Sequence, residues 1–269
     1  LFSASPYSWE VLGHEQHIAS AQIQDFKNFY DKHYQPNNAV LVISGDFDIK
    51  QTMSSVRKYF GKYPPGHPIT RDSFKLKPLQ KPYKETIYDD KVQLPGIFLA
   101  FRGPAKDDPD YYATSLLTDI LASGESSRLY KRLVDKDQIA VQASAMTMSL
   151  QHSGLLMLIG IASMNNDIED LEEAIKEEIS KIIKNGVSEK ELQKAKNITE
   201  TQFIFDKKQN LGKAEALAQY YSYFNKPELI NEELDKYMEV TSDDIKKAAN
   251  RFFNTDNTVT LIYLPQKNK

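Results

Sequence analysis

Residues 123–141 read Ser-Gly-Glu-Ser-Ser-Arg-Leu-Tyr-Lys-Arg-Leu-Val-Asp-Lys-Asp-Gln-Ile-Ala-Val, near the middle of the 269-residue chain. They follow a helical pattern, Pro109 to Ala122, in which the proline suits a first turn. They lead into two strand-like runs, Ala140 to Leu150 and Gly154 to Ala162, which we expect to form a hairpin around residues 151–153. The stretch therefore connects a helix to a strand.

Further strands and helices surround this stretch. Ile168 to Lys184 predicts an amphipathic helix ending at Asn185-Gly186, and helical character continues from Ser188, with breaks, to about Phe253. Strand-like runs occur at Glu85 to Asp89, Gly96 to Phe101 and Thr258 to Leu264. We expect an α+β fold with helices packed on one face of a mainly antiparallel sheet.

The first part of the chain gives a shorter pattern. After loops or short turns through Ser20, the sequence predicts a helix from Ala21 to His33, a buried strand from Ala39 to Ser44, and a helix from Ile49 to Phe60 capped by Asp48. The order of helix and strand in residues 25–46 recurs in residues 243–265. Such a recurrence is typical of an internal duplication whose first copy is truncated.

A proline-rich segment separates these parts. Pro64, Pro65, Pro68, Pro78 and Pro82 fall in a run with little apolar periodicity. We predict a linker at residues 64–84, between the remainder of one half at 1–63 and a complete half at 85–269. The alternative is a long surface loop within one domain.

Composition excludes several classes of function. The 34 basic and 37 acidic residues are interspersed and give a net charge of −3, which argues against nucleic acid as the main partner. The absence of cysteine removes disulfides, thiolate metal ligands and cysteine nucleophiles. No apolar run is long enough for a membrane span. Because the first residue is not methionine, we expect the chain to begin inside a longer protein.

The histidines give no strong metal motif. His14 and His17 are three residues apart beside Glu15, but their spacing fits neither known zinc-peptidase helix motif, so we expect a polar loop with no metal ligands. The other histidines are isolated, and the acidic run Glu169 to Glu173 suits the solvated start of a helix. These residues alone predict a globular α+β protein without a catalytic motif.

Several motifs, in order, resemble the M16 zinc peptidases, the insulinase or pitrilysin family that includes mitochondrial processing peptidase. The first half contains Pro6-Tyr7-Ser8-Trp9, Tyr34-Gln35-Pro36-Asn37-Asn38 before an apolar run, and Gly45-Asp46. The second contains Ser123-Gly124-Glu125-Ser126-Ser127-Arg128-Leu129-Tyr130 and Val240-Thr241-Ser242-Asp243-Asp244-Ile245. The resemblance covers essentially the whole chain and implies the LuxS/MPP-like metallohydrolase fold, with one incomplete and one complete homologous half.

The resemblance also implies where catalytic residues belong. The family binds zinc through an inverted His-x-x-Glu-His motif and a distal glutamate, which would lie upstream of Leu1, so we expect zinc in the parent protein and no metal site in this chain. Active members add an arginine and a tyrosine after the Ser-Ser-Arg-Leu-Tyr segment. Here Val134 and Val141 occupy those positions, and valine donates no side-chain hydrogen bond. We therefore expect no catalytic residue in this chain, and name as peptide-facing candidates Ser126, Ser127, Arg128, Val134 and Val141.

These implications give two hypotheses for function. The first is part of an M16-type zinc metallopeptidase that cleaves peptides or unfolded polypeptides, as the zinc-bearing subunit of a pair whose homologous partner supplies the arginine and tyrosine. This fragment would itself be inactive. The alternative is a non-catalytic, M16-like structural or assembly subunit. The resemblance favours a bacterial periplasm or cell envelope as the location.

Overall fold

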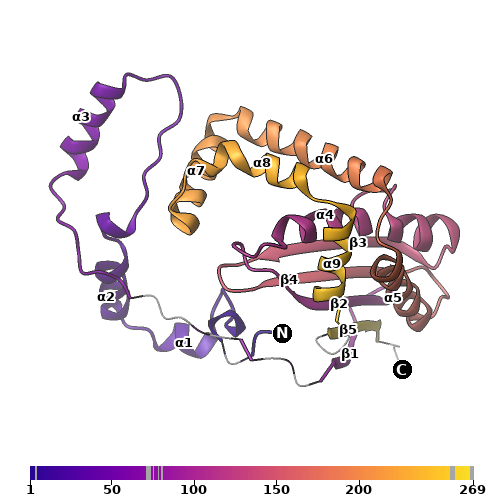
Figure 1. Cartoon of the computed structure of the whole chain (residues 1–269). Helices are drawn as coiled ribbons and strands as arrows, with labels where there is room; N and C mark the ends of the chain where they lie inside the picture. Colours follow the sequence, from indigo (N-terminus) through magenta and orange to yellow (C-terminus); the bar gives the residue numbers. More distant parts are fainter. Residues whose placement is uncertain are drawn as a thin grey trace. The chain divides into compact units, whose positions relative to one another are not determined.

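The computed structural model describes residues 1–3, 5–70, 74, 76, 77, 79, 81–254 and 258–266. The chain divides into two compact units (Figure 1). The first, here called the sheet unit, comprises Leu1, Lys77–Thr201 and Glu233–Lys269. The second, called the helical unit, comprises Phe2–Leu76 and Gln202–Glu232. The 123–141 stretch lies in the sheet unit.

The sheet unit is built on five strands. They are ordered β1-β5-β2-β4-β3, with β1 and β5 parallel and the other pairs antiparallel. The mainly antiparallel sheet and the predicted hairpin, formed by β3 and β4, are thereby confirmed. The strands are β1 (Tyr83–Asp89), β2 (Gly96–Gly103), β3 (Ala140–Ser149), β4 (Gly154–Ala162) and β5 (Thr258–Pro265).

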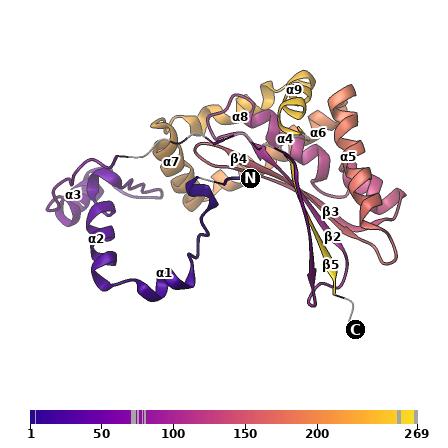
Figure 2. The same cartoon turned by 90° about the horizontal axis from the view of Figure 1, so that it is seen from below.

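Helices cover one face of this sheet, as predicted (Figure 2). They are α4 (Tyr111–Ala122), α5 (Ile168–Asn185) and α9 (Ser242–Phe252). Leu156 and Leu158 of β4 are buried in the core because alternate residues of a strand point to the same face. Gly160, next on that face, lets α5 approach closely, since an added Cβ would lie 3.0 Å from Leu171. The core therefore lies between the sheet and these helices.

The helical unit contains α1 (Glu15–Ser20), α2 (Ile23–His33), α3 (Ile49–Phe60) and α7 (Asn210–Phe224), with two 3-10 turns, η1 (Pro6–Ser8) and η2 (Pro36–Asn38). Both units share α6 (Glu189–Lys208) and α8 (Leu229–Glu239). The predictions of α2 and α3 are confirmed. Asp48 caps α3 by accepting a hydrogen bond from the N–H of Gln51 at 2.7 Å. The sequence did not predict α1.

The predicted strand at residues 39–44 is wrong. The structure has no regular secondary structure there, and Leu41 is 57% exposed. A strand needs a partner for its backbone groups, and the described residues of the helical unit include no strand to pair with it. Neither α2 nor α3 has a buried residue, so their apolar side chains are not packed into a core either. The internal duplication therefore stays a prediction.

Among the described residues of the predicted linker, only those at its end belong to a regular element. Residues 64–70 form no helix or strand, β1 begins at Tyr83, and residues 71–73, 75, 78 and 80 lie outside the described set. The assignment of 64–84 as a linker between homologous halves stays a prediction. Within the described ranges, none of the helices combines the length and hydrophobicity required to span a bilayer.

Candidate functional site

The 123–141 stretch forms a tight connection between α4 and β3. A turn at residues 123–127 is closed by Ser127, whose N–H and hydroxyl both donate to the carbonyl of Gly124, at 3.1 and 2.7 Å. The chain then enters a π-helix, η3 (Tyr130–Lys136), in the sheet unit. Leu129 and Leu133 are fully buried and join the core. These two leucines explain why the segment packs inward along one side.

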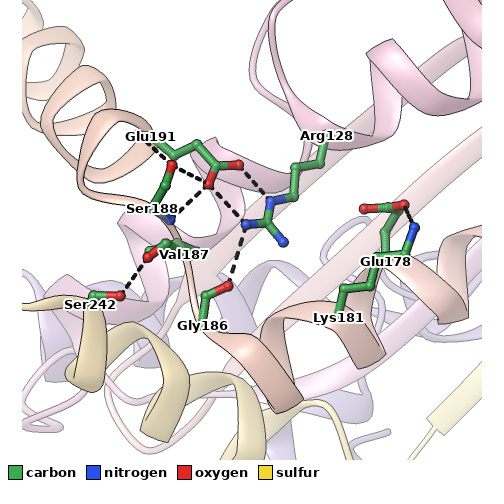
Figure 3. A network of polar contacts seen from close by, with 8 residues as sticks. All are labelled: Arg128, Glu178, Lys181, Gly186, Val187, Ser188, Glu191 and Ser242. Carbon is green, nitrogen blue, oxygen red and sulfur yellow. Dashed lines mark hydrogen bonds and ion pairs between the residues drawn. The ribbon is translucent and has the colours of Figure 1, made fainter.

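Arg128 is held by an internal clamp (Figure 3). Its Nε and Nη2 donate to the two carboxylate oxygens of Glu191 at 2.6 and 2.9 Å, and Nη2 also reaches the carbonyl of Gly186 at 3.3 Å. Glu191 accepts a further hydrogen bond from the N–H of Ser188 at 2.9 Å, and its own N–H donates to the Ser188 hydroxyl at 3.3 Å, which forms a capping box at the start of α6. The arginine of the family motif therefore fastens this stretch to the turn between α5 and α6.

The charge on Glu191 is strongly favoured in this clamp. The hydrogen bond from Arg128, supported by those from Ser188, lowers the pKa of Glu191 to about 2 against the effect of burial. Paired, doubly hydrogen-bonded carboxylates of this kind stabilise folded structure and do not serve as acids or bases at neutral pH. Ser242 of α9 adds to the same turn by donating to the carbonyl of Val187 at 2.7 Å (Figure 3).

The two serines of the motif, Ser126 and Ser127, differ in exposure. Ser126 is exposed, and its hydroxyl accepts a hydrogen bond from the ammonium group of Lys194 on α6. Ser127 is only 2% exposed, and its hydroxyl is used within the turn. Of the serine and arginine candidates, Ser126 is therefore the most exposed, whereas the side chain of Arg128 is 19% exposed and Ser127 is buried.

Arg132 lies at the centre of a second charged cluster. Its Nε donates to Asp137 at 2.6 Å, and its two Nη atoms donate to Glu177 at 2.8 Å and Glu178 at 3.2 Å. The first two of these hydrogen bonds are the main reason that the pKa of Arg132 is raised above its usual range. Glu178 is itself buried and also accepts from Lys181 at 2.5 Å (Figure 3). Each nitrogen of the guanidinium group thus donates to a carboxylate, one directly after η3 and two on α5.

Val134 and Val141 stand at the corner where η3 meets β3. Val134 is partly buried and packs against the core, whereas Val141 is 52% exposed. Ala140 pairs with Ala162 and Gln142 pairs with Ile161, so Val141 occupies a β-bulge. Neither valine has a side chain that can donate a hydrogen bond. We call residues 134–141 the valine corner.

Backbone geometry makes the valine corner sharp. Gln138 has a φ of 53°, which is the left-handed region that residues with a Cβ rarely adopt. The N–H of Asp137 donates to the carbonyl of Arg132 at 2.9 Å and ends the π-helix. A π-helix followed by a left-handed residue and a bulge turns the chain within a few residues, and such irregularities are frequent at functional sites.

Sequence reasoning missed the charged cluster and one carboxylate. Arg132 and Asp137 are opposite charges five residues apart, a spacing that pairs in a π-helix and not in an α-helix. Asp119 is the single acidic residue of α4, and burial raises its pKa to about 6. Its carboxylate has no polar partner in the part of the chain that the structure describes. A single acidic residue in a largely apolar helix was the sequence signal that could have identified Asp119 as a partly buried carboxylate.

The residues considered for metal binding do not form a metal site. The rings of His14 and His17 meet edge to face with centroids 5.6 Å apart, and both residues are exposed. Within the described ranges, no three histidine, aspartate or glutamate side chains converge as a metal site requires. The donor set of these residues therefore does not fit a structural or catalytic zinc ion.

Comparison with known proteins relates this geometry to a family. The family model described as "Peptidase M16 inactive domain" matches residues 20–199. A curated relative, the zinc protease PqqE of Helicobacter pylori, is 24% identical over 97% of this chain and 59% of its own length. The chain thus spans about three fifths of the length of that relative.

Solved structures give the same result. A protease from Helicobacter pylori superposes with a TM-score of 0.88 at 25% identity, over 97% of this chain and 63% of that one. The first half of the periplasmic protease PqqL from Escherichia coli gives 0.75 at 19% identity, over 95% of this chain and 57% of that one. A chain of Complex III2 from Candida albicans gives 0.83 at 17% identity, over 97% and 63%. The last two likenesses concern the fold alone.

Proposed function

This chain belongs to the family described as the Peptidase M16 inactive domain, and from this premise we propose that it is a non-catalytic part of an M16-type zinc metallopeptidase. The substrates would be peptides or unfolded polypeptides. A relative that covers nearly all of this chain is named a zinc protease, which supports the enzyme class of the parent protein. The fragment itself would be inactive.

The observation that carries this proposal is the chemistry of the valine corner. A side chain that holds a peptide carbonyl or an oxyanion must donate a hydrogen bond, and Val134 and Val141 offer none. The two nearest arginines in the sequence cannot take over this role, because Arg128 is clamped by Glu191 and Arg132 by three carboxylates. At these two positions a peptide can therefore meet only apolar side chains and backbone hydrogen-bonding groups.

We place the peptide-facing role on Val141 first, then on Val134 and Ser126. Val141 is exposed at a bulge, and Ser126 is exposed at the other end of the stretch. The contacts of Ser127 and Arg128 within the chain suit a supporting role, in which they fix the stretch without touching the substrate.

The proposal assigns zinc to a part of the parent protein outside this chain. The described residues do not fit the metal, so no step of the reaction is routed through them. The missing hydrogen-bond donors would come from a homologous M16 subunit, which makes the parent the zinc-bearing member of a pair. A bacterial periplasm or cell envelope would suit such a protein, and a periplasmic protease is among its structural neighbours.

The alternative is a structural or assembly subunit of M16 type. The loss of both donor positions supports it as well, and a Complex III2 chain shares the fold. The two functions differ in what the full-length protein does with its partner present. A catalytic parent binds zinc and cleaves peptides, whereas an assembly subunit does neither.

The test uses the full-length parent protein, purified with and without the product of the neighbouring gene. We expect about one zinc per full-length chain by metal analysis, and cleavage of a quenched fluorescent peptide only when both proteins are present. The 269-residue chain with the partner serves as the control and should cleave nothing. If the assembled pair holds no zinc and cleaves no unfolded polypeptide, the assembly function replaces the enzymatic one. Cleavage by the full-length protein alone would refute the paired arrangement.

A further inference from the structure

The second charged cluster is built more elaborately than a surface ion pair. Arg132 reaches one carboxylate on its own segment and two on α5, at 2.6, 2.8 and 3.2 Å. Its side chain is 23% exposed, and that of Glu178 is 8% exposed. An arginine held by three partners in this way has one permitted position, because its planar group fixes direction as well as charge.

Arg132 is bonded to Asp137, the residue that ends the π-helix, through both its backbone and its side chain. The carbonyl of Arg132 accepts from the N–H of Asp137 at 2.9 Å, and the guanidinium donates to the carboxylate of Asp137 at 2.6 Å. Val134 lies inside the loop closed by these two bonds. Gln138, whose φ of 53° is in the left-handed region, is the residue directly after Asp137. The bonds from Arg132 therefore set both the place of Val134 and the direction in which the chain leaves toward Val141.

We propose that Arg132 is a positioning residue that locks the valine corner against α5, so that an extended peptide meets Val134 and Val141 in a preformed arrangement. This inference rests on the proposed function, because it assumes that the corner faces substrate. Arg132 touches no substrate itself and acts through Val134 and Val141. A rigid corner reduces the ordering that peptide binding would otherwise require.

Arg251 in the same unit can serve as a control for Arg132. Arg251 of α9 also bridges two carboxylates, Asp108 at 2.8 Å and Asp110 at 2.5 Å. Arg251 lies outside the valine corner and contacts neither Arg128 nor Arg132 through its ion pairs. Arg251→Ala therefore removes a comparable set of ion pairs without loosening the corner. Both alanine variants should lower thermal stability, and only Arg132→Ala should alter peptide binding.

The experiment measures kcat and KM for a quenched fluorescent peptide with the full-length protein and its partner. We expect Arg132→Ala to raise KM about tenfold with kcat changed less than about threefold, because the lost interaction concerns binding. Arg132→Lys, which keeps the charge, should recover part of the loss. Arg251→Ala should leave both constants within about twofold of wild type.

A milder variant covers the case in which Arg132→Ala does not fold. Asp137→Asn keeps the size of the side chain and leaves the bonds from Arg132 to Glu177 and Glu178 in place. It should still raise KM several-fold and accelerate amide exchange at residues 138–142 of this chain, relative to α9. A folded Arg132→Ala or Asp137→Asn protein with wild-type constants overturns the inference alone. A wild-type pair that cleaves nothing overturns the proposed function, and the inference with it.

Discussion

Asp119→Asn should stabilise the sheet unit at neutral pH. Asp119 is partly buried on α4, and burial raises the pKa of its carboxyl group from the ordinary 3.8 to about 6. Above pH 6 the folded protein must hold a charge that has lost much of its hydration and has no polar partner among the described residues. An asparagine of nearly the same shape removes that charge.

The size of the effect follows from the linkage between protonation and folding. A pKa of about 6 in place of 3.8 corresponds to about 3 kcal/mol, and partial exposure of the group reduces this to about 2 kcal/mol. Between these pH values the folded protein binds a proton that the unfolded chain has lost, so stability falls as pH rises. The contribution of Asp119 is therefore most favourable below about pH 4 and least favourable above about pH 6.

The assay is unfolding of the 269-residue chain by urea and by heat at pH 4 and pH 7.5. At pH 7.5 we expect Asp119→Asn to gain about 2 kcal/mol, or roughly 4–8 °C in melting temperature for a unit of this size. At pH 4 the gain should nearly vanish, because Asp119 is already protonated. Asp135→Asn, at an exposed position in η3, is the control and should change stability by less than about 0.5 kcal/mol at either pH. An equal gain at both pH values, or a loss at pH 7.5, would refute the reasoning.

Three further predictions concern the elements that hold the site. Gly160→Ala should destabilise the sheet unit by about 1–3 kcal/mol in urea unfolding, because the added Cβ would lie 3.0 Å from Leu171, and a neutral result would mean that α5 shifts easily. Glu191→Gln should cost about 1 kcal/mol at pH 7, because the partly exposed clamp with Arg128 is screened by solvent. That contribution should disappear as pH falls from about 4.5 toward 2, since the folded pKa lies below the unfolded one, and a pH-independent loss would contradict the role of charge. Gln138→Gly should stabilise by about 0.5–1 kcal/mol in thermal unfolding, because glycine adopts a φ of 53° without strain, and a destabilised variant would show that the glutamine side chain compensates.

The regular elements of the sheet unit could be predicted because their signals are local. The hairpin of β3 and β4, the amphipathic helix α5 and the capping box at Ser188 all depend on residues close in sequence. The stretch from Ala39 to Ser44 has an equally good strand pattern, yet it forms no strand. Its pattern gives only a tendency, and a strand exists only where another strand accepts its hydrogen bonds.

The candidate site was harder to predict than the fold. Val134 and Val141 could be located from the motif, but the motif does not show which of its polar residues are used internally. Arg128 pairs with Glu191 on α6, which is 63 residues away in the sequence. Arg132, within the π-helix, pairs with carboxylates of α5. Such pairings depend on how elements pack, so single-sequence periodicity carries no signal for them.

The order of the strands has a consequence for how the protein is made. β5 is the last strand in sequence among the described residues, yet it lies between β1 and β2, where Tyr83 pairs with Val259 and Gly96 with Tyr263. While the ribosome still holds residues 258–265, β1 has no neighbour and β2 lacks one of its two. The sheet can therefore close only after synthesis has passed its final strand, and the unfinished chain exposes unpaired strand edges until then.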